Sequence, residues 1–366
     1  MLLVLATAVI ALGPASGARA EPALVEVGDA RLSVALDGDE FAIGRDSVIE
    51  WVRRSATIVA GYYGTFPVRT LEVRILAVDG ATVRNGRTLP TTPPRIHLGV
   101  GRDVSAAALV HDWVLVHEMV HLALPEVGDE HAWLAEGLAT YVEGIARVQA
   151  GNLTADELWQ ENFRDMPKGL PGPDDAGLDR THTWARTYWG GALFCLEADV
   201  TIRERTANRR GLQDSLRAVA LASGGMVAEW PIERVFQVGD TATATSVLTD
   251  LYSRMRSRPA APDLAALWRR LGVEWVGGRV RLTNGAPEAA VREAITRTPA
   301  TSPGSDLSRG LRLQPVAARV APGACGPAGL LVSAPRECTS MSTALHCRGL
   351  AGVRRGAMPP TVAHQG

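Results

Sequence analysis

The hydrophobic and polar positions along this chain change their period several times, and each period predicts a different kind of element. Apolar residues at every second position predict half-buried strands, whereas recurrence every three or four residues predicts amphipathic helices. The first hundred residues show both periods. Strands are predicted over residues 23–36, 71–78 and 95–100, with an amphipathic helix over 46–63 and a loop from 79 to 94.

Beyond residue 100 the pattern is mainly helical. One helix is expected from Asp103 or Ser105, either of which can cap it, to Leu124, where Pro125 stops it. A second helix is expected over 131–150, after a short acidic loop. Further helices are predicted over 187–205, 212–222, 263–271 and 287–296, after a loop at 166–180 that is dense in Gly, Pro and Asp.

The two ends of the chain differ from its body. An apolar run over residues 2–12, followed by Ala18-Arg19-Ala20, is typical of a secretory signal peptide and is too short to span a bilayer. We therefore expect a signal peptide at 1–20 and an exported protein, periplasmic or extracellular, with a short buried strand as the alternative. Residues 298–366 lack periodicity and are rich in Gly, Pro, Ser and Ala, so a disordered tail is expected, or a readthrough or frameshifted end.

Length and composition limit the range of functions. A chain of 366 residues exceeds what one hydrophobic core usually supports, which suggests a sheet-containing lobe over 21–150 and a helical lobe over 151–297. The formal net charge of −1 gives no reason to expect nucleic acid or an acidic membrane surface as a partner. No integral membrane segment is expected, and the oligomeric state is left open.

The four cysteines match no zinc-binding spacing. Cys195 is predicted to be a small buried apolar residue, whereas Cys325, Cys338 and Cys347 lie in the predicted tail. They give no basis for a disulfide framework.

The strongest chemical signal is the run His117-Glu118-Met119-Val120-His121. Two histidines four apart share one face of a helix and can bind the same ion, with Glu118 beside them as a possible base. Catalytic zinc takes three protein ligands and keeps one position open for water. If the chain turns at Pro125 and the second helix runs back antiparallel, Glu136 returns to the first helix as the third ligand, and Gly137 permits close packing.

Several alternatives to this ligand set stay open. Glu130, His131 and Glu143 are also near enough in sequence to be the third ligand. The zinc class with three histidines is excluded, because Leu124 and Val127 stand where it needs Gly and His. The alternative to a metal site is a buried helix in which His117 and His121 hydrogen-bond within the protein. This alternative does not explain why Glu136-Gly137 follows at a spacing that suits a third ligand.

Two motifs together resemble a known family. His117-Glu118-x-x-His121 with Trp133-Leu134-x-Glu136-Gly137 resembles the gluzincin metallopeptidases, which include thermolysin and the alanyl and glycyl aminopeptidases. The run Tyr188-Trp189-Gly190-Gly191-Ala192 is similar to the stretch that carries their catalytic tyrosine, although Gly190 replaces the usual lysine. The resemblance implies an α+β fold with a thermolysin-like catalytic domain: a small N-terminal mixed sheet with the zinc-binding helix, followed by a mainly helical lobe.

The resemblance also implies a mechanism. Zn²⁺ on His117, His121 and Glu136 would activate water, Glu118 would act as general base on a peptide or protein substrate, and Tyr188 would hydrogen-bond the oxyanion. No Gly-x-Met-Glu-Asn segment precedes the zinc helix, so exopeptidase activity is not implied. The alternative function is a catalytically inactive exported protein that keeps the fold for binding or for envelope scaffolding.

Other polar residues receive weaker predictions. The alternative for Tyr188 is an aromatic anchor beside Trp184 and Trp189. His97 is expected to be a solvated strand histidine, on a strand of the kind that borders a cleft, with substrate contact as the alternative for it and for His182. Arg186 and Asp199 are expected to form a salt-bridged face.

Overall fold

The computed structural model describes residues 21–38 and 40–298. The predicted signal peptide and, from residue 299, the predicted tail with its three cysteines lie outside these residues. Among the described helices, none has both the length and the apolar character that crossing a membrane requires.

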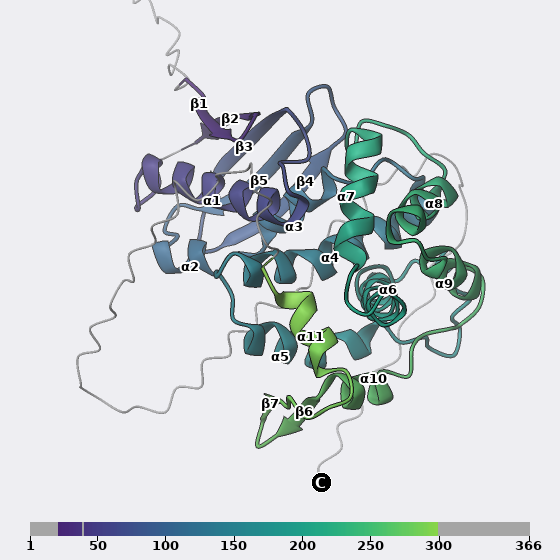
Figure 1. The fold of residues 1–366 in the computed structure, drawn as a ribbon. Helices are drawn as coiled ribbons and strands as arrows, with labels where there is room; N and C mark the ends of the chain where they lie inside the picture. Colours follow the sequence, from purple (N-terminus) through teal and green to yellow (C-terminus); the bar gives the residue numbers. More distant parts are fainter. Residues whose placement is uncertain (1–20, 39, 299–366) are drawn as a thin grey trace, which may run out of the picture. The chain divides into compact units, whose positions relative to one another are not determined.

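Among the described residues, five strands form one mixed sheet in the order β1-β2-β3-β5-β4 (Figure 1). Strands β2, β3 and β5 run parallel, whereas β1 pairs with β2, and β4 with β5, in the antiparallel sense. The strands are β1 (Ala23–Val27), β2 (Ala30–Asp37), β3 (Thr70–Val78), β4 (Val83–Leu89) and β5 (Arg95–Gly101). The α+β class and the mixed sheet predicted from the sequence are thereby confirmed.

Two of the predictions for the sheet are wrong in detail. Residues 23–36 form a hairpin, because Gly28 takes a positive φ of 56° and turns the chain between β1 and β2. The predicted loop 79–94 contains β4, whose largely polar sequence lacks the apolar alternation of a buried strand. As a result β5 is an internal strand, and β4 forms this edge of the sheet.

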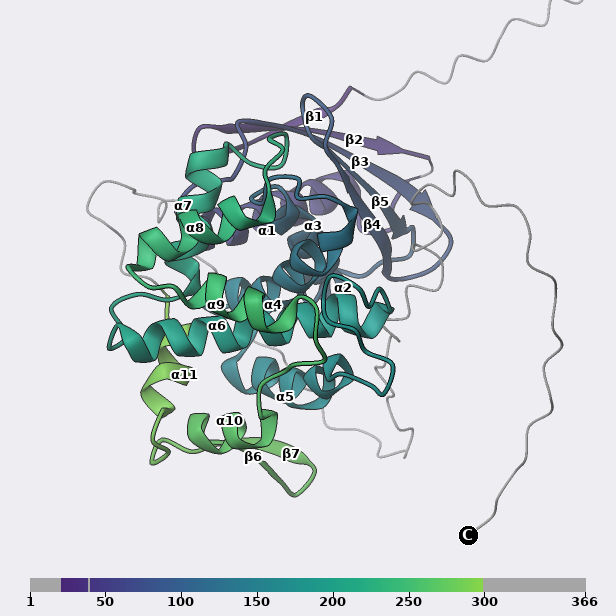
Figure 2. The ribbon, with the colours of Figure 1, turned by 90° about the vertical axis from the view of Figure 1, so that its right-hand side faces the viewer.

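Helices α1 (Arg45–Tyr63) and α3 (Val114–His121) pack against one face of this sheet, as Figures 1 and 2 show. Leu71, Val73 and Ile75 of β3 point toward these helices and are buried, whereas Leu76 on the opposite face is 52% exposed. Burying one side chain in every two is what fixes the register of the strands. The face that carries α3 is therefore the inner face of the sheet.

The single helix predicted over residues 103–124 is broken in two. Ser105 caps a short helix, α2 (Ala106–Val110), as one of the two predicted caps. The chain then leaves the helical path, and the Asp112 carboxylate accepts bonds from the backbone N–H groups of Val114 and Leu115, both at 3.1 Å. Because such acceptors satisfy the first free donors of a helix, Asp112 starts α3 afresh.

Helix α4 (Ala132–Gln149) packs against both α3 and α6 (Gly191–Arg205), as predicted for a helix that returns after Pro125. The remaining helices are α5 (Ala155–Asp165), α7 (Leu212–Ser223), α8 (Ile232–Thr243), α9 (Val247–Met255), α10 (Leu264–Leu271) and α11 (Ala289–Thr296), with short turns η1 (Asp129–His131) and η2 (Met166–Gly169) and a hairpin of β6 (Val273–Val276) and β7 (Arg279–Leu282). The sequence did not predict α5, α8, α9 or this hairpin. The lobe boundary at residue 150 remains a prediction.

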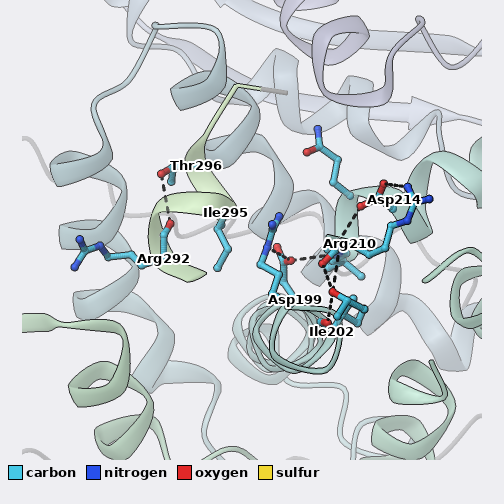
Figure 3. Close-up of polar contacts among 12 residues, drawn as sticks. Asp199, Ile202, Arg210, Asp214, Arg292, Ile295 and Thr296 are labelled. Carbon is cyan, nitrogen blue, oxygen red and sulfur yellow. Dashed lines mark hydrogen bonds and ion pairs between the residues drawn. The ribbon is translucent and has the colours of Figure 1, made fainter. Parts of the chain in front are cut away.

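Arg186 and Asp199 form ion pairs, but in the interior and not on a surface face. Asp199, which is labelled in Figure 3, accepts bonds from Tyr141 Oη at 3.0 Å, Arg203 Nε at 2.7 Å and the backbone N–H of Leu212 at 2.9 Å. Arg186 lies 2.8 Å from the Asp175 carboxylate and donates to the Gly169 carbonyl. Such pairs are satisfied from several sides, so removing one partner leaves a buried charge.

Gly137 is the point of closest approach between α4 and the start of α6. A Cβ added to Gly137 would lie 2.3 Å from the backbone Cα and C of Gly191. Backbone atoms cannot swing aside as a flexible side chain can. Gly137 thus permits close packing, as predicted, but against the start of α6 and not against the first helix of the motif, α3.

Replacing Gly137 by alanine is expected to lower the free energy of unfolding by about 3 kcal/mol, the upper end for overpacked cores, because α4 and α6 must separate. Urea unfolding measures the change. Gly61→Ala is the matched control. Gly61 lies in α1, and a Cβ added to it would meet no atom within 4 Å. The free energy of unfolding of this variant should therefore rise by about 0.5–1 kcal/mol. Equal midpoints for Gly137→Ala and the wild type would contradict the close contact.

Candidate functional site

The three predicted zinc ligands come together in the structure. Glu136 Oε2 lies 3.2 Å from His117 Nε2 and 3.6 Å from His121 Nε2, and the ligand atoms of all three residues lie within 4.8 Å of one another. Nitrogen and oxygen atoms bound at about 2.0–2.2 Å to a tetrahedral zinc are about 3.3–3.6 Å apart. The observed separations therefore fit one zinc ion.

The backbone explains this convergence. His117 and His121 lie one turn apart on α3, and Glu136 is in the second turn of α4, which packs against α3. The rivals for the third position lie elsewhere. Glu143 is buried in an ion pair with Arg147, with a separation of 3.3 Å.

His131 is also occupied by other partners. Its Nδ1 lies 3.0 Å from Asp179 Oδ1, and the same carboxylate accepts bonds from Trp133 Nε1 and Tyr252 Oη, both at 2.9 Å. The side chain of Glu130 is exposed and lies 3.8 Å from His131. Glu130, His131, Asp179 and Tyr252 border a cavity of about 490 Å³ that none of the three predicted zinc ligands lines.

Charge favours the ionised form of Glu136, and burial favours the neutral form of His121, and these are the states that bind a metal. Burial alone would raise the pKa of Glu136, but His121, His117 and the Tyr188 hydroxyl outweigh it and bring the pKa to about 2. Burial lowers the pKa of His121, against the opposing effect of Glu136. A carboxylate and neutral imidazoles are the forms that ligate zinc, so the donor set suits this ion.

Ring contacts set the orientation of His117. Its ring stacks on Tyr188 at 6.2 Å with an interplanar angle of 13°, and meets the ring of Trp113 edge to face at 5.7 Å. Its Nδ1 is buried without a hydrogen-bond partner among the described residues. Aromatic packing thus holds the ring where an outer hydrogen bond often does so in zinc sites.

Glu118 contacts the edge strand β4 beside the group formed by His117, His121 and Glu136. Its Oε2 lies 2.6 Å from Thr88 Oγ1, and its side chain passes over Gly86. Burial raises the pKa of Glu118, while His121 and the bond from Thr88 act in the opposite direction. The residue is 8% exposed, next to His117 and beside the ligand group.

Tyr188 enters the site from a π-helical turn, η3 (Arg186–Gly190), directly before α6. Its ring stacks on His117 and, at 5.7 Å, on Trp184, and its hydroxyl hydrogen-bonds Glu136. Single π-turns inserted into helices are frequent at functional sites. The structure therefore places the Tyr188 ring among aromatic residues and its hydroxyl on Glu136. Both roles that the sequence offered, packing and contact with an oxyanion, are compatible with this position.

Two other sequence predictions have a clear outcome, for His97 and Cys195, whereas substrate contact of His182 stays a prediction. His97 is exposed on the outer face of the sheet, where it pairs in register with Arg87, so it is the solvated strand histidine that was predicted. His182 is exposed in the loop before η3. Cys195 is buried, as predicted, and burial raises the pKa of its thiol.

Gly86 and Thr88 are the site residues that sequence reasoning missed. Both lie on the strand that was predicted as a loop, so neither could be placed near Glu118. A weak signal existed, since an isolated glycine within a strand often marks a close approach of another chain segment.

Comparison with solved structures finds a similar fold in an aminopeptidase N family protein from Idiomarina loihiensis, with a TM-score of 0.53 and 13% sequence identity. The match covers 69% of this chain and 49% of that chain. An M1 zinc metallopeptidase from Deinococcus radiodurans matches with a TM-score of 0.44 and 14% identity, over 66% of this chain and 52% of that chain. The present chain thus spans about half the length of these structures.

Neither a protein-family model nor a curated protein sequence matches the chain. At these identities the likeness concerns the fold alone. At that level, the resemblance to gluzincin aminopeptidases drawn from the two motifs is confirmed.

Proposed function

We propose that this chain is a zinc-dependent peptidase of the gluzincin type, with a thermolysin-like arrangement of its site. The observation that carries the proposal is the convergence of His117, His121 and Glu136 at separations that fit one tetrahedral zinc. The position of Glu118 beside this group supplies the base that hydrolysis needs.

In this mechanism the bound zinc would lower the pKa of a water toward about 7 and polarise the scissile carbonyl. Glu118 takes a proton from the attacking water and returns it to the leaving amine. The Tyr188 hydroxyl, which reaches Glu136 at the edge of the group, donates to the oxyanion that forms on the substrate. The chain's own residues thus provide proton transfer and charge stabilisation.

The substrate we propose is a peptide or protein segment in extended form. Strand β4 has no further strand beyond it among the described residues, and its inner face carries the residues that contact Glu118. An extended segment can add to such an edge through main-chain hydrogen bonds, which would bring its carbonyl groups past the metal. The apolar run at residues 2–12 supports export as part of this proposal.

Metal analysis of purified protein together with a peptide library tests the proposal. We expect about one zinc per chain, cleavage at internal or terminal peptide bonds, and loss of cleavage with a chelator that added zinc reverses. Protein that stays metal-free and inert after incubation with zinc would contradict the proposal. That result would favour the inactive binding or scaffold protein instead.

Replacing Tyr188 by phenylalanine separates catalysis from packing. The variant keeps the ring that stacks on His117 and Trp184 but loses the hydroxyl, so we expect kcat to fall about 100-fold with little change in stability. Steady-state kinetics and thermal unfolding measure the two effects. Unchanged kcat would assign Tyr188 to packing alone.

A further inference from the structure

Strand β4 presents two residues to Glu118 from the inner face of the sheet. Gly86 pairs in register with Leu98 and Thr88 with Ile96, both of which are buried on that face. Because side chains alternate along a strand, Gly86 and Thr88 point the same way, toward α3. The intervening Arg87 is exposed.

The Thr88 hydroxyl hydrogen-bonds one oxygen of the Glu118 carboxylate. Its hydroxyl lies 2.6 Å from Oε2 and 2.9 Å from the backbone carbonyl oxygen of the same residue. The hydroxyl has one proton, and the shorter distance and the negative charge both favour donation to the carboxylate. The second contact keeps the hydroxyl close to the backbone of α3.

Gly86 makes room for the rest of the side chain. A Cβ added at Gly86 would lie 2.4 Å from Glu118 Cγ and 2.8 Å from its Oε1, which is closer than real Cβ atoms approach. Any other residue at this position would push the carboxylate off the strand. The strand is thus shaped to Glu118 at two successive inward positions.

We propose that Gly86 and Thr88 form a cradle that positions the Glu118 carboxylate for proton transfer, an inference that rests on the function proposed above. Thr88 holds Oε2, so that Oε1 is the oxygen left to take the proton of the attacking water. Thr88 and Gly86 are positioning residues, and they act through Glu118.

The test compares Thr88→Val, which keeps the shape but removes the donor, with Thr88→Ser, which keeps the donor. A hydrogen bond to a charged group contributes about 1.5–3 kcal/mol, which corresponds to a fall in kcat of about 10- to 100-fold in Thr88→Val. We expect the KM and the zinc content to stay at the wild-type values, and Thr88→Ser to recover kcat to within about threefold. Thr70→Val is the matched control, because Thr70 is exposed on strand β3, two strands away from β4.

Crystal structures of the zinc-loaded wild type, Thr88→Val and Gly86→Ala provide a readout independent of turnover. In both variants we expect the Glu118 carboxylate to leave β4 while the ligand group stays in place. A carboxylate that keeps its position in Thr88→Val, a wild-type kcat in that variant, or a Thr88→Ser variant as slow as Thr88→Val would overturn the proposal. If the wild type cleaves no peptide, the proposed function fails, and the position of Glu118 alone decides whether the cradle exists.

Discussion

Replacing Glu118 by glutamine is expected to lower kcat by about 1,000-fold while the protein keeps its zinc. General bases contribute about 10²- to 10⁴-fold, and an amide of the same size cannot accept the proton of the attacking water. The amide oxygen can still accept the bond from Thr88, so the side chain should keep its place. Steady-state kinetics on a cleaved peptide and the zinc content per chain measure the two effects.

Glu50→Gln is the control for this substitution. Glu50 lies on α1 with a side chain that is 65% exposed, and its contact with Arg53 is a surface ion pair. Such pairs contribute about 0–1 kcal/mol, so this variant should match the wild type in both measurements. A Glu118→Gln variant with wild-type turnover would remove Glu118 from the mechanism.

Replacing His121 by alanine is expected to weaken zinc binding by more than about 100-fold, since even loss of an outer partner of a ligand costs about 10- to 100-fold. Glu136→Ala should weaken zinc binding to a similar extent, because the Glu136 carboxylate contacts both histidines. Dialysed protein should then retain about one zinc per chain in the wild type and almost none in the variants. Elemental analysis measures this content.

Thermal unfolding gives a second measure of the same site. A ligand at 1,000 times its dissociation constant stabilises the folded state by about 4 kcal/mol, so a chelator should lower the Tm of the wild type by several degrees. The variants should show no such shift. His97→Ala is the control, since His97 is exposed on the outer face of the sheet. A chelator shift that persists in His121→Ala would place the metal elsewhere.

The group of His117, His121 and Glu136 could be predicted from the sequence because local rules bring these residues near one another. The spacing of His117 and His121 fixes their common face on any helix, and Pro125 requires a turn that returns the chain to α3. Glu136 lies at a suitable distance along that return, as do Glu130, His131 and Glu143, and the fold places Glu136 beside the two histidines. The convergence of these three side chains was thus predicted, although their binding of zinc remains a proposal.

The cradle for Glu118 could not be predicted from the sequence, because it depends on a strand without an apolar pattern. Strand β4 forms by pairing with β5, and this tertiary contact overrides the preference of its polar residues for a loop. The break before α3 was missed for a related reason. Asp112 reads as one more polar residue on a helix, and only the fold shows that its carboxylate begins a new helix.

The contact between Gly137 and Gly191 limits how this protein can diversify. Glu136 precedes one glycine and Tyr188 lies three residues before the other, so main-chain contact fixes the distance between these two side chains. Side chains elsewhere on α4 and α6 do not enter that contact. A lineage can therefore exchange exposed residues of these two helices while Glu136 and Tyr188 keep their separation, and selection experiments should recover changes at such exposed positions before they recover them at the two glycines.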